Sequence, residues 1–327
     1  MPDTLPTYDD VRRAAERIRP VAVVTPLIES QLLNEELGGR LLVKCEMLQR
    51  TGSFKFRGAY NRISMIPDVD RKKGVVAFSS GNHAQGGAAA AKLLDTPACL
   101  VMPADAPAMK IANTKAFGGE VILYDRFKDS REEIGARLSR ERGSTLVKPY
   151  DDAGVIAGQG TIGIEIAAQA KAMGLKPDAV LTACSGGGLV TGVALGLSAE
   201  LPETSVHSVE PAGLDDMARS LASGKLERND PAARTICDAL MAPTPGDITF
   251  AIAKQRVKSG FAVTDEEVKR AMATAFRHFK LVVEPGGATT LAAVLTGKAP
   301  IKGRTVVVVA SGGNVDAALF REALAQA

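Results

Sequence analysis

Cysteine and histidine are scarce in this chain of 327 residues. The cysteines stand far apart in the sequence, at Cys45, Cys99, Cys184 and Cys237. Because they form no CxxC pair, they argue against a disulfide framework and against a cysteine metal site, and they suit a reducing cytoplasm. The three histidines also lack the spacing of metal ligands.

Long hydrophobic runs and an excess of basic residues are missing as well. No apolar run approaches the ~20 residues that a membrane-spanning helix needs. The first ten residues, MPDTLPTYDD, have neither the basic nor the apolar region of a secretory signal. A net charge of +3, without a basic run interleaved with aromatic residues, gives no sign of nucleic-acid binding. We therefore expect a cytoplasmic protein that binds neither a membrane nor a nucleic acid.

What the chain does have is the pattern of an α/β protein. Hydrophobic residues make up 46% of the chain and charged residues 24%, which is typical of a globular protein. Short β-branched runs without alternation, such as VVAF and TVVVV, predict strands that are buried on both faces of parallel sheets. We predict a doubly wound α/β fold with two such sheets. The expected strands are 40–48, 74–80, 98–103, 120–124, 145–150, 178–184, 205–210 and 305–311.

The helices are predicted from caps and periodicity. Thr7, with Asp10 three residues on, has the capping-box pattern of a helix N-terminus. Further helices are expected at 84–94, before 117, and at 129–142, 161–173, 189–199, 265–279 and 286–296. The stretch 224–250 is predicted to be mostly loop.

Three polar or glycine-rich turns follow predicted strands. They are SSGNH (79–83, the serine loop), SGGG (185–188, the glycine loop) and SGGN (311–314). Ligands collect at the carboxyl ends of parallel strands, so these turns are candidates for one binding site. Consecutive glycines let backbone N–H groups approach an anion, and the helix that follows adds its positive end. The glycine loop is therefore a candidate phosphate site.

Two other interpretations of the glycine loop remain open at this point. Gly186, Gly188 and Gly192 form GxGxxxG, and Glu210 closes the next strand about 20 residues on, as in a dinucleotide site. A tight turn without any ligand is the other possibility.

The segment TGSFKFRGA (51–59) is predicted to be a loop that enters a helix, with Ser53 as the N-cap. Lys55 lies in the first turn of that helix, between Phe54 and Phe56. Apolar surroundings and the positive helix end both lower the pKa of an amine, as a nucleophilic lysine requires. Most lysines are solvated, however, so the position of Lys55 does not identify its role by itself.

Seven segments together resemble the fold-type II pyridoxal-phosphate (PLP) enzymes, and more narrowly the threonine and serine dehydratases and serine racemase. They are TGSFKFRGA, SSGNHAQG, GQGT (158–161), CSGGGLVTG, VEP (209–211), EPGGA (284–288) and SGGNVD (311–316). The resemblance extends from about residue 7 to residue 316. It argues against the dinucleotide site, because a nicotinamide enzyme has no use for the lysine motif and SGGN.

The resemblance implies a tryptophan synthase β-like fold and a homodimer. One group of strand–helix units falls between the two halves of the cofactor site. We therefore expect a large cofactor-binding domain formed by 1–73 and 151–327, and a small inserted domain, 74–150, that closes over the substrate.

The resemblance also implies roles for individual residues. Lys55 would carry the cofactor, and Phe54 would pack beside its ring. Asn82 would contact the 3′-oxygen of the cofactor, and Ser311 its pyridine nitrogen. The phosphate would be held by Ser185, Gly186, Gly187, Gly188 and Leu189. The substrate carboxylate would be met by Ser79, Ser80, Asn82 and His83.

These roles imply a β-elimination. Lys55 would remove the Cα proton, the β-hydroxyl would leave, and hydrolysis would give a 2-oxo acid and ammonia. A neutral serine at the pyridine nitrogen favours expulsion of the leaving group over reprotonation. We expect an ammonia-lyase that acts on L-threonine or L-serine. A 3-hydroxyaspartate ammonia-lyase is an alternative, as is a serine racemase with side elimination that uses Ser80 as its second acid/base. A non-catalytic binding protein is disfavoured.

The resemblance suggests two further hypotheses, and the sequence departs from the family pattern at one position. Glu210, the Leu214 carbonyl and Asp216 match a divalent-cation site of serine racemase-like members, and oxygen ligands suit Mg²⁺, Ca²⁺ or Mn²⁺. A solvated acidic loop or a monovalent ion is the alternative.

Arg131 aligns with an arginine that can meet a second carboxylate, although we interpret it as a surface residue paired with Glu132 or a neighbouring acid. Asp238 is followed by Ala239 where the family usually has glycine, and this departure leaves the substrate open.

Overall fold

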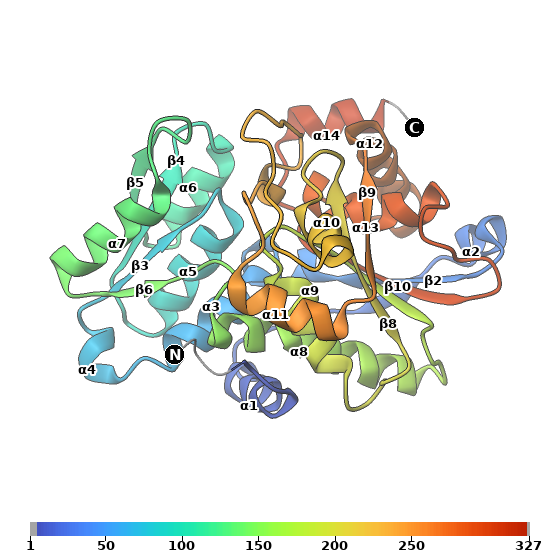
Figure 1. The fold of residues 1–327 in the computed structure, drawn as a ribbon, viewed down its shortest axis with the longest axis horizontal. Helices are drawn as coiled ribbons and strands as arrows, with labels where there is room; N and C mark the ends of the chain where they lie inside the picture. The colour runs from blue at the N-terminus through green and yellow to red at the C-terminus, as the bar shows by residue number, and fades with distance from the viewer. Residues whose placement is uncertain (1–4, 326–327) are drawn as a thin grey trace.

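The computed structural model describes residues 5–325 and contains two sheets (Figure 1). The strands between residues 75 and 147 form one sheet, and strands from both sides of this segment form the other. The first four residues of the segment examined for a secretory signal lie outside the described range. The domain boundaries at 73/74 and 150/151 remain predictions.

The larger sheet has six strands. Their order in space is β1 (Leu27–Glu29), β2 (Arg40–Cys45), β10 (Thr305–Ala310), β7 (Ala179–Ala183), β8 (Ser205–Pro211) and β9 (Ser259–Val263). All neighbours are parallel except β1 and β2. In β10 the side chains from Val306 to Val309 are all buried, as the run TVVVV predicts for a central strand.

The smaller sheet has four strands, all parallel. Their order is β5 (Glu120–Tyr124), β4 (Ala98–Pro103), β3 (Val75–Phe78) and β6 (Thr145–Val147). The two inner strands, β3 and β4, are buried along their whole length. The predicted α/β fold with two parallel-sheet-based units is confirmed.

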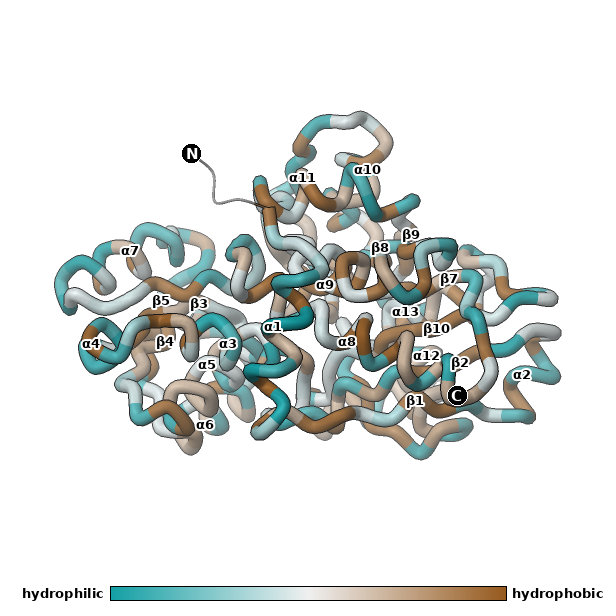
Figure 2. The backbone as a smooth tube through the Cα atoms, turned by 90° about the horizontal axis from the view of Figure 1, so that it is seen from below, coloured by the Kyte–Doolittle hydropathy of each residue, from teal (hydrophilic) through white to brown (hydrophobic). Residues whose placement is uncertain are grey.

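Helices cover both sheets (Figure 2). They are α1 (Tyr8–Ile18), α2 (Gln31–Leu37), α3 (Lys55–Ser64), α4 (Asp68–Arg71), α5 (Asn82–Leu93), α6 (Ala108–Ala116), α7 (Arg131–Arg142), α8 (Ala153–Ala172), α9 (Gly188–Leu197), α10 (Asp216–Ser223), α11 (Asp247–Arg256), α12 (Asp265–Thr274), α13 (Pro285–Leu295) and α14 (Ala317–Leu324). Short 3₁₀-helical segments form η1 (Glu46–Leu48), η2 (Arg50–Gly52) and η3 (Asp238–Leu240), and a π-helical segment forms η4 (Ala275–Phe279). Within residues 5–325, no helix has the length and apolar character to cross a membrane.

The capping box that the sequence predicts at the first helix is present. The Thr7 side chain accepts from the backbone of Asp10, and the Asp10 carboxylate accepts from the Thr7 N–H at 2.8 Å. The predicted cap at Ser53 is wrong. Helix α3 begins after Phe54, and Ser53 is extended and pairs with Gly312 of the SGGN turn. This pairing joins the lysine segment to the end of β10.

Two sequence motifs serve the close crossing of α8 and α9. A Cβ on Gly160 would lie 2.7 Å from the carbonyl oxygen of Gly192, and one on Gly192 would lie 2.6 Å from that of Ile156. Gly160 belongs to GQGT, and Gly192 is the last glycine of GxGxxxG. Both glycines are therefore required by backbone contact between helices.

Helix α3 lies at the junction of the two sheets (Figure 1). Its buried face, with Phe56 and Ile63, packs in one cluster with Ala88 of α5 and Leu100 of β4. Although α3 falls in the segment predicted for the large domain, its apolar face completes the core of the small sheet.

Candidate active site

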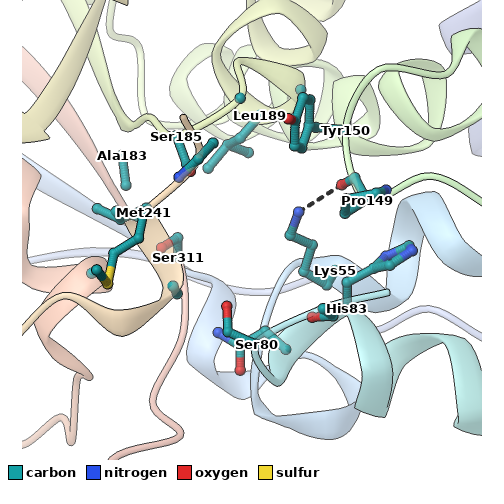
Figure 3. A pocket seen from close by; sticks show the side chains of 18 of the residues that line it. Lys55, Ser80, His83, Pro149, Tyr150, Ala183, Ser185, Leu189, Met241 and Ser311 are labelled. Carbon is teal, nitrogen blue, oxygen red and sulfur yellow. Dashed lines mark hydrogen bonds between the residues drawn. The ribbon is translucent and has the colours of Figure 1, made fainter. Parts of the chain in front are cut away.

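The three turns and the lysine segment meet in one cavity between the sheets (Figure 3). Strands β7 and β10 are neighbours, so the glycine loop and the SGGN turn lie side by side at their carboxyl ends. The serine loop reaches the cavity from β3 of the other sheet. Every residue expected to hold cofactor or substrate lines it: Phe54, Lys55, Ser79, Ser80, Asn82, His83, Ser185, Gly186, Gly187, Gly188, Leu189 and Ser311. Their individual roles remain predictions.

Lys55 extends into the cavity from the first turn of α3 (Figure 3). Its Nζ donates a hydrogen bond to the carbonyl oxygen of Pro149 at 2.7 Å and lies 5.2 Å from the centre of the Phe54 ring. Removal from water lowers the pKa of the Lys55 amine to about 8, and the positive charge of Arg131 contributes in the same direction. An amine with this pKa has a far larger neutral fraction near physiological pH than an ordinary lysine, and the neutral form can act as a nucleophile or a base.

The glycine loop presents bare backbone at the start of α9. Gly187 has a φ of +99°, which favours glycine, and a Cβ on Gly186 would lie 2.3 Å from the Tyr150 ring. The N-terminus of α9, which begins at Gly188, adds its partial positive charge at the same point. The arrangement fits a phosphate group. The Ser185 hydroxyl accepts from the Ala242 N–H at 3.0 Å and keeps its own proton to donate.

The serine loop is held by hydrogen bonds from both sides. Within the loop, Ser79 Oγ accepts from the Gly81 N–H at 3.0 Å. Ser80 Oγ donates to the Asp238 carbonyl oxygen at 3.3 Å. Asn82 Nδ2 donates to Glu284 Oε1 at 2.5 Å, so the amide of Asn82 has a fixed orientation at the start of α5.

His83 is buried beside Lys55. Burial, assisted by the Lys55 charge, lowers the pKa of the imidazole to about 3, so the ring is neutral. Its Nε2 lies 3.3 Å from the Val147 carbonyl oxygen, whereas Nδ1 is buried without a hydrogen-bond partner among the described residues. If Nε2 carries the proton, Nδ1 offers a lone pair to a ligand.

Two arginines also line the cavity: Arg126, which the sequence did not single out, and Arg131, for which the surface interpretation was favoured. Arg131 Nε donates to Glu132 at 2.8 Å, as expected, but the side chain is only 18% exposed and its guanidinium lies 5.4 Å from the centre of the Phe78 ring. The interpretation of Arg131 as a surface residue is therefore wrong. Phe78 ends β3, so the stacking turns the arginine inward from the start of α7.

The segment VEPAGLDD lies outside the cavity lining. Glu210, which is fully buried, accepts hydrogen bonds from the N–H groups of Met217 and Ala218 at 2.9 and 2.8 Å and thereby caps α10. Asp216 accepts from Asn229 at 2.6 Å through Oδ1, while its Oδ2 is buried without a partner. Burial raises the pKa of Glu210 well above its usual value and that of Asp216 to about 6. These two acids are not solvated, so that part of the alternative is wrong.

Within the part of the chain that the structure describes, no group of three or more His, Cys, Asp or Glu side chains could hold a metal ion. The divalent cation expected from Glu210, Leu214 and Asp216 is therefore not supported by a cluster of side chains alone.

Several cavity residues were not expected from the sequence. Pro149 and Tyr150 follow β6, and Arg126 follows β5. The rule that ligands gather at the carboxyl ends of parallel strands also applies to these two strands, and it is the signal that could have found them.

Comparisons with known proteins identify the family of this chain. The model of a family described as "Pyridoxal-phosphate dependent enzyme" matches residues 18–312. The L-threo-3-hydroxyaspartate ammonia-lyase of Pseudomonas sp is 43% identical over 312 residues, which cover 95% of this chain and 96% of that protein. The serine racemase of Schizosaccharomyces pombe is 40% identical over 322 residues, with 98% of both chains covered.

Among solved structures, the threonine deaminase of T.th. superimposes with a TM-score of 0.89 and 44% identity, covering 95% of this chain and 99% of that one. The predicted fold-type II architecture is confirmed, and so is the resemblance to the group of threonine and serine dehydratases and serine racemase. The dinucleotide alternative is wrong, since Gly192 packs helices and Glu210 lies outside the cavity lining. The chain belongs to the family of pyridoxal-phosphate-dependent enzymes.

Proposed function

We propose that this enzyme is an ammonia-lyase that eliminates water and then ammonia from a small β-hydroxy amino acid, L-threonine or L-serine, to give a 2-oxo acid. The observation that supports it best is the position of Lys55. Its amine, with a pKa lowered to about 8, extends into a cavity that also contains the glycine loop and the polar serine loop. The relatives reported above are an ammonia-lyase, a racemase and a threonine deaminase, which agree with a reaction at the substrate Cα.

The cavity offers a fitting group for each part of the cofactor. The glycine loop and the N-terminus of α9 would hold the phosphate, and the Ser311 hydroxyl would meet the ring nitrogen. Phe54 would pack beside the ring, and Asn82 would meet the ring oxygen. When bound, the cofactor supplies an electron sink for the negative charge that develops at Cα.

Lys55 would be both the point of attachment for the cofactor and the base that takes the Cα proton. The Pro149 carbonyl, 2.7 Å from Nζ, holds the amine at a defined place when it is not attached. The substrate carboxylate would lie on the serine loop, near the neutral ring of His83. Because Ser80 Oγ donates to the Asp238 carbonyl, its proton is already engaged. We therefore assign Ser80 to substrate binding, and this favours elimination over racemisation.

A substrate with a second carboxylate, 3-hydroxyaspartate, is the second candidate. It is favoured by the two cavity arginines, Arg126 and Arg131. Arg126 is held by Asp105 at 2.7 Å, whereas Arg131 bonds Glu132 through Nε at the base of its guanidinium. Arg131 could thus offer its two terminal nitrogens to a carboxylate in a bidentate arrangement.

The experiment that tests the proposed function is a substrate panel. Purified enzyme loaded with the cofactor would be given L-serine, L-threonine and L-threo-3-hydroxyaspartate, with ammonia, 2-oxo acid and the D-enantiomer measured in parallel. Equal amounts of ammonia and 2-oxo acid from at least one substrate support the lyase. Release of D-amino acid without ammonia would replace it with the racemase.

We further propose that a divalent cation binds near Glu210 and Asp216. The support is the buried Oδ2 of Asp216, which has no partner among the described residues, together with a second buried carboxylate nearby. These oxygens and the Leu214 carbonyl are the ligand type that Mg²⁺, Ca²⁺ and Mn²⁺ prefer. A cation would stabilise both carboxylates in their charged forms, which burial alone disfavours.

Three wider expectations complete the proposal. We propose a homodimer in the cytoplasm, in which the small domain of residues 74–150 closes over the substrate. Four free, buried cysteines agree with a reducing compartment. Sedimentation of the purified protein would determine its oligomeric state, and small-angle scattering with and without substrate would test the closure.

A further inference from the structure

A buried lysine joins the two sheets beside the cavity. Lys110 lies in α6, on the four-stranded sheet, and is 1% exposed. Its Nζ lies 2.8 and 3.0 Å from the two carboxylate oxygens of Asp238 and 3.1 Å from Oε2 of Glu284. Asp238 begins η3 and Glu284 immediately precedes α13, which packs on β7 and β10. The three charges therefore connect an element of the small sheet to two segments on the large one.

Both partners of Lys110 also hold the serine loop. Glu284 accepts from Asn82 through Oε1, the carboxylate oxygen that does not face Lys110. Asp238 accepts from Ser80 Oγ through its backbone carbonyl, while its carboxylate faces Lys110. A change at Lys110 would thus reach the loop along two separate paths.

Asp238 also directly precedes a segment that lines the cavity. The segment 239–242, which follows it, lines the cavity together with the serine loop. The far end of this segment is fixed by the hydrogen bond from the Ala242 N–H to Ser185 Oγ. Its near end is fixed by the ion pair between Asp238 and Lys110.

The aliphatic part of Lys110 supports the serine loop directly. Gly81 has a φ of +156°, and a Cβ placed on it would lie 2.3 Å from Cδ of Lys110. The lysine stem therefore packs against the turn of the loop, and no larger residue fits there. The stem of Lys110 thus contacts the serine loop directly, and its ammonium group acts on the same loop through Asp238 and Glu284.

Lys110 is not among the described residues that line the cavity, so it acts through others. We propose that Lys110 is a positioning residue for substrate binding: it holds Asp238 and Glu284 together and so sets the distance between the serine loop and the segment 239–242. That the ligand between the serine loop and the segment 239–242 is an amino-acid carboxylate rests on the proposed function. The coupling between these two parts of the cavity lining, called the two walls below, does not depend on that function.

The physical basis is the charge balance of the cluster. Burial alone would lower the pKa of Lys110, but Glu284 and Asp238 outweigh it and raise the pKa, so the amine is an ammonium ion at neutral pH. Without that charge, the buried carboxylate of Glu284 and the partly buried carboxylate of Asp238 would face each other and either repel or take up a proton. Both responses would loosen the walls. Among the described residues, the side chain of Lys110 forms its hydrogen bonds and ion pairs with Asp238 and Glu284 and not with the glycine loop, so the backbone N–H groups expected to hold the cofactor phosphate would persist even if the bond from Ala242 to Ser185 weakens.

The test compares Lys110→Met with Asp238→Asn and with a control, Lys115→Met, which changes an exposed lysine of the same helix. Cofactor content is read from absorbance, and kcat and KM are measured with the best substrate of the wild type. Hydrogen exchange is followed at the Gly81 and Ala242 amides, which report on the two walls without any turnover. In Lys110→Met, we expect KM to rise ~10-fold or more with kcat changed far less, because ground-state and transition-state binding weaken together. Both amides should exchange at least ~10-fold faster, since their local opening becomes easier.

The outcomes separate the alternatives. A folded, cofactor-loaded Lys110→Met protein with the KM and amide exchange of the wild type would overturn the inference, and so would an equal effect of Lys115→Met. A lower melting temperature without a change in KM or exchange would assign Lys110 a purely structural role and would also overturn it. If Lys110→Met does not fold, Asp238→Asn decides on the same criteria. If the wild type acts on no hydroxy amino acid, the proposed function fails, and the exchange measurement still tests the coupling.

Discussion

The Nζ of Lys55 and the carbonyl oxygen of Pro149 lie 2.7 Å apart and share a hydrogen bond. Lys55 begins α3, whereas Pro149 follows β6 of the four-stranded sheet, 94 positions further along the chain. The bond fixes the amine at the boundary between the two sheets. An amine placed there lies close to both loops that would bind the cofactor and the substrate.

Attachment of the cofactor should become faster as the pH rises through about 8. Only a neutral amine attacks the cofactor aldehyde, and the pKa of Lys55 is lowered from an ordinary 10.5 to about 8. The neutral fraction, and with it the rate, should therefore increase from pH 7 to 9. Stopped-flow absorbance of apoenzyme mixed with the cofactor would give the midpoint. A midpoint close to 10.5 would mean that Lys55 is solvated and would contradict the site.

Gly186→Ala should abolish tight cofactor binding. The new Cβ would lie 2.3 Å from the Tyr150 ring, so either the ring or the glycine loop must move. Gly87→Ala, in α5, is the matched control because its Cβ would meet only Leu100 at 3.7 Å, an ordinary contact. Titration with the cofactor should show a weakening of ~100-fold or more in the first variant and little change in the second. Equal affinities would show that the glycine loop does not hold the phosphate.

Arg131→Gln should discriminate between substrates with one and two carboxylates. A charge-assisted hydrogen bond contributes ~1.5–3 kcal/mol, so kcat/KM for L-threo-3-hydroxyaspartate should fall ~10–100-fold while that for L-threonine falls less. Arg137→Gln changes an exposed arginine of the same helix and serves as the control. An equal loss for both substrates would indicate that Arg131 acts through the Lys55 amine, whose pKa it lowers, and not through a second carboxylate.

Chelation should lower the melting temperature if a divalent cation binds near Glu210. An ion that binds only the folded state stabilises it by mass action, and added Mg²⁺ or Mn²⁺ should restore the loss. Asp216→Asn should melt like the chelated wild type and no longer respond to metal. Differential scanning calorimetry would measure both. If neither chelator nor metal changes the melting temperature of the wild type, the cation proposal is contradicted. Glu210 then has only the function that the structure shows, the capping of α10.

The parts of the fold that follow from the sequence are those that local pattern determines. Short buried apolar runs predicted β3, β4, β7 and β10, and the turns after three of these strands were recognised as one site. These predictions worked because a parallel strand buried on both faces has a distinctive composition. The turn residues that follow such strands are then brought together by the sheet itself.

Elements that depend on tertiary contacts were missed. Strand β9 is SGFAV, with a serine and a glycine in place of a β-branched run, and it forms because it pairs with β8. Strand β1 has three residues and exists through its antiparallel pairing with β2. Ser53 has the side chain of an N-cap, but its pairing with Gly312 outweighs local preference.

The site residues that the sequence did not predict also depend on tertiary contacts. The inward orientation of Arg131 depends on Phe78, which is 53 positions away in the sequence. Lys110 becomes important only when α6 meets Asp238 and Glu284. A single sequence shows which residues are charged, but the pairing of charges across two sheets requires the fold.

The central claim, that Lys55 holds the cofactor in this cavity, is tested most directly by chemical trapping. Borohydride reduces the link between the cofactor aldehyde and a lysine amine to a stable bond, and peptide mass spectrometry then identifies the modified residue. We predict that the cofactor mass is found on the peptide containing Lys55 and that Lys55→Ala protein carries none. Cofactor trapped on another lysine of the wild type, or on no lysine at all, would contradict the account.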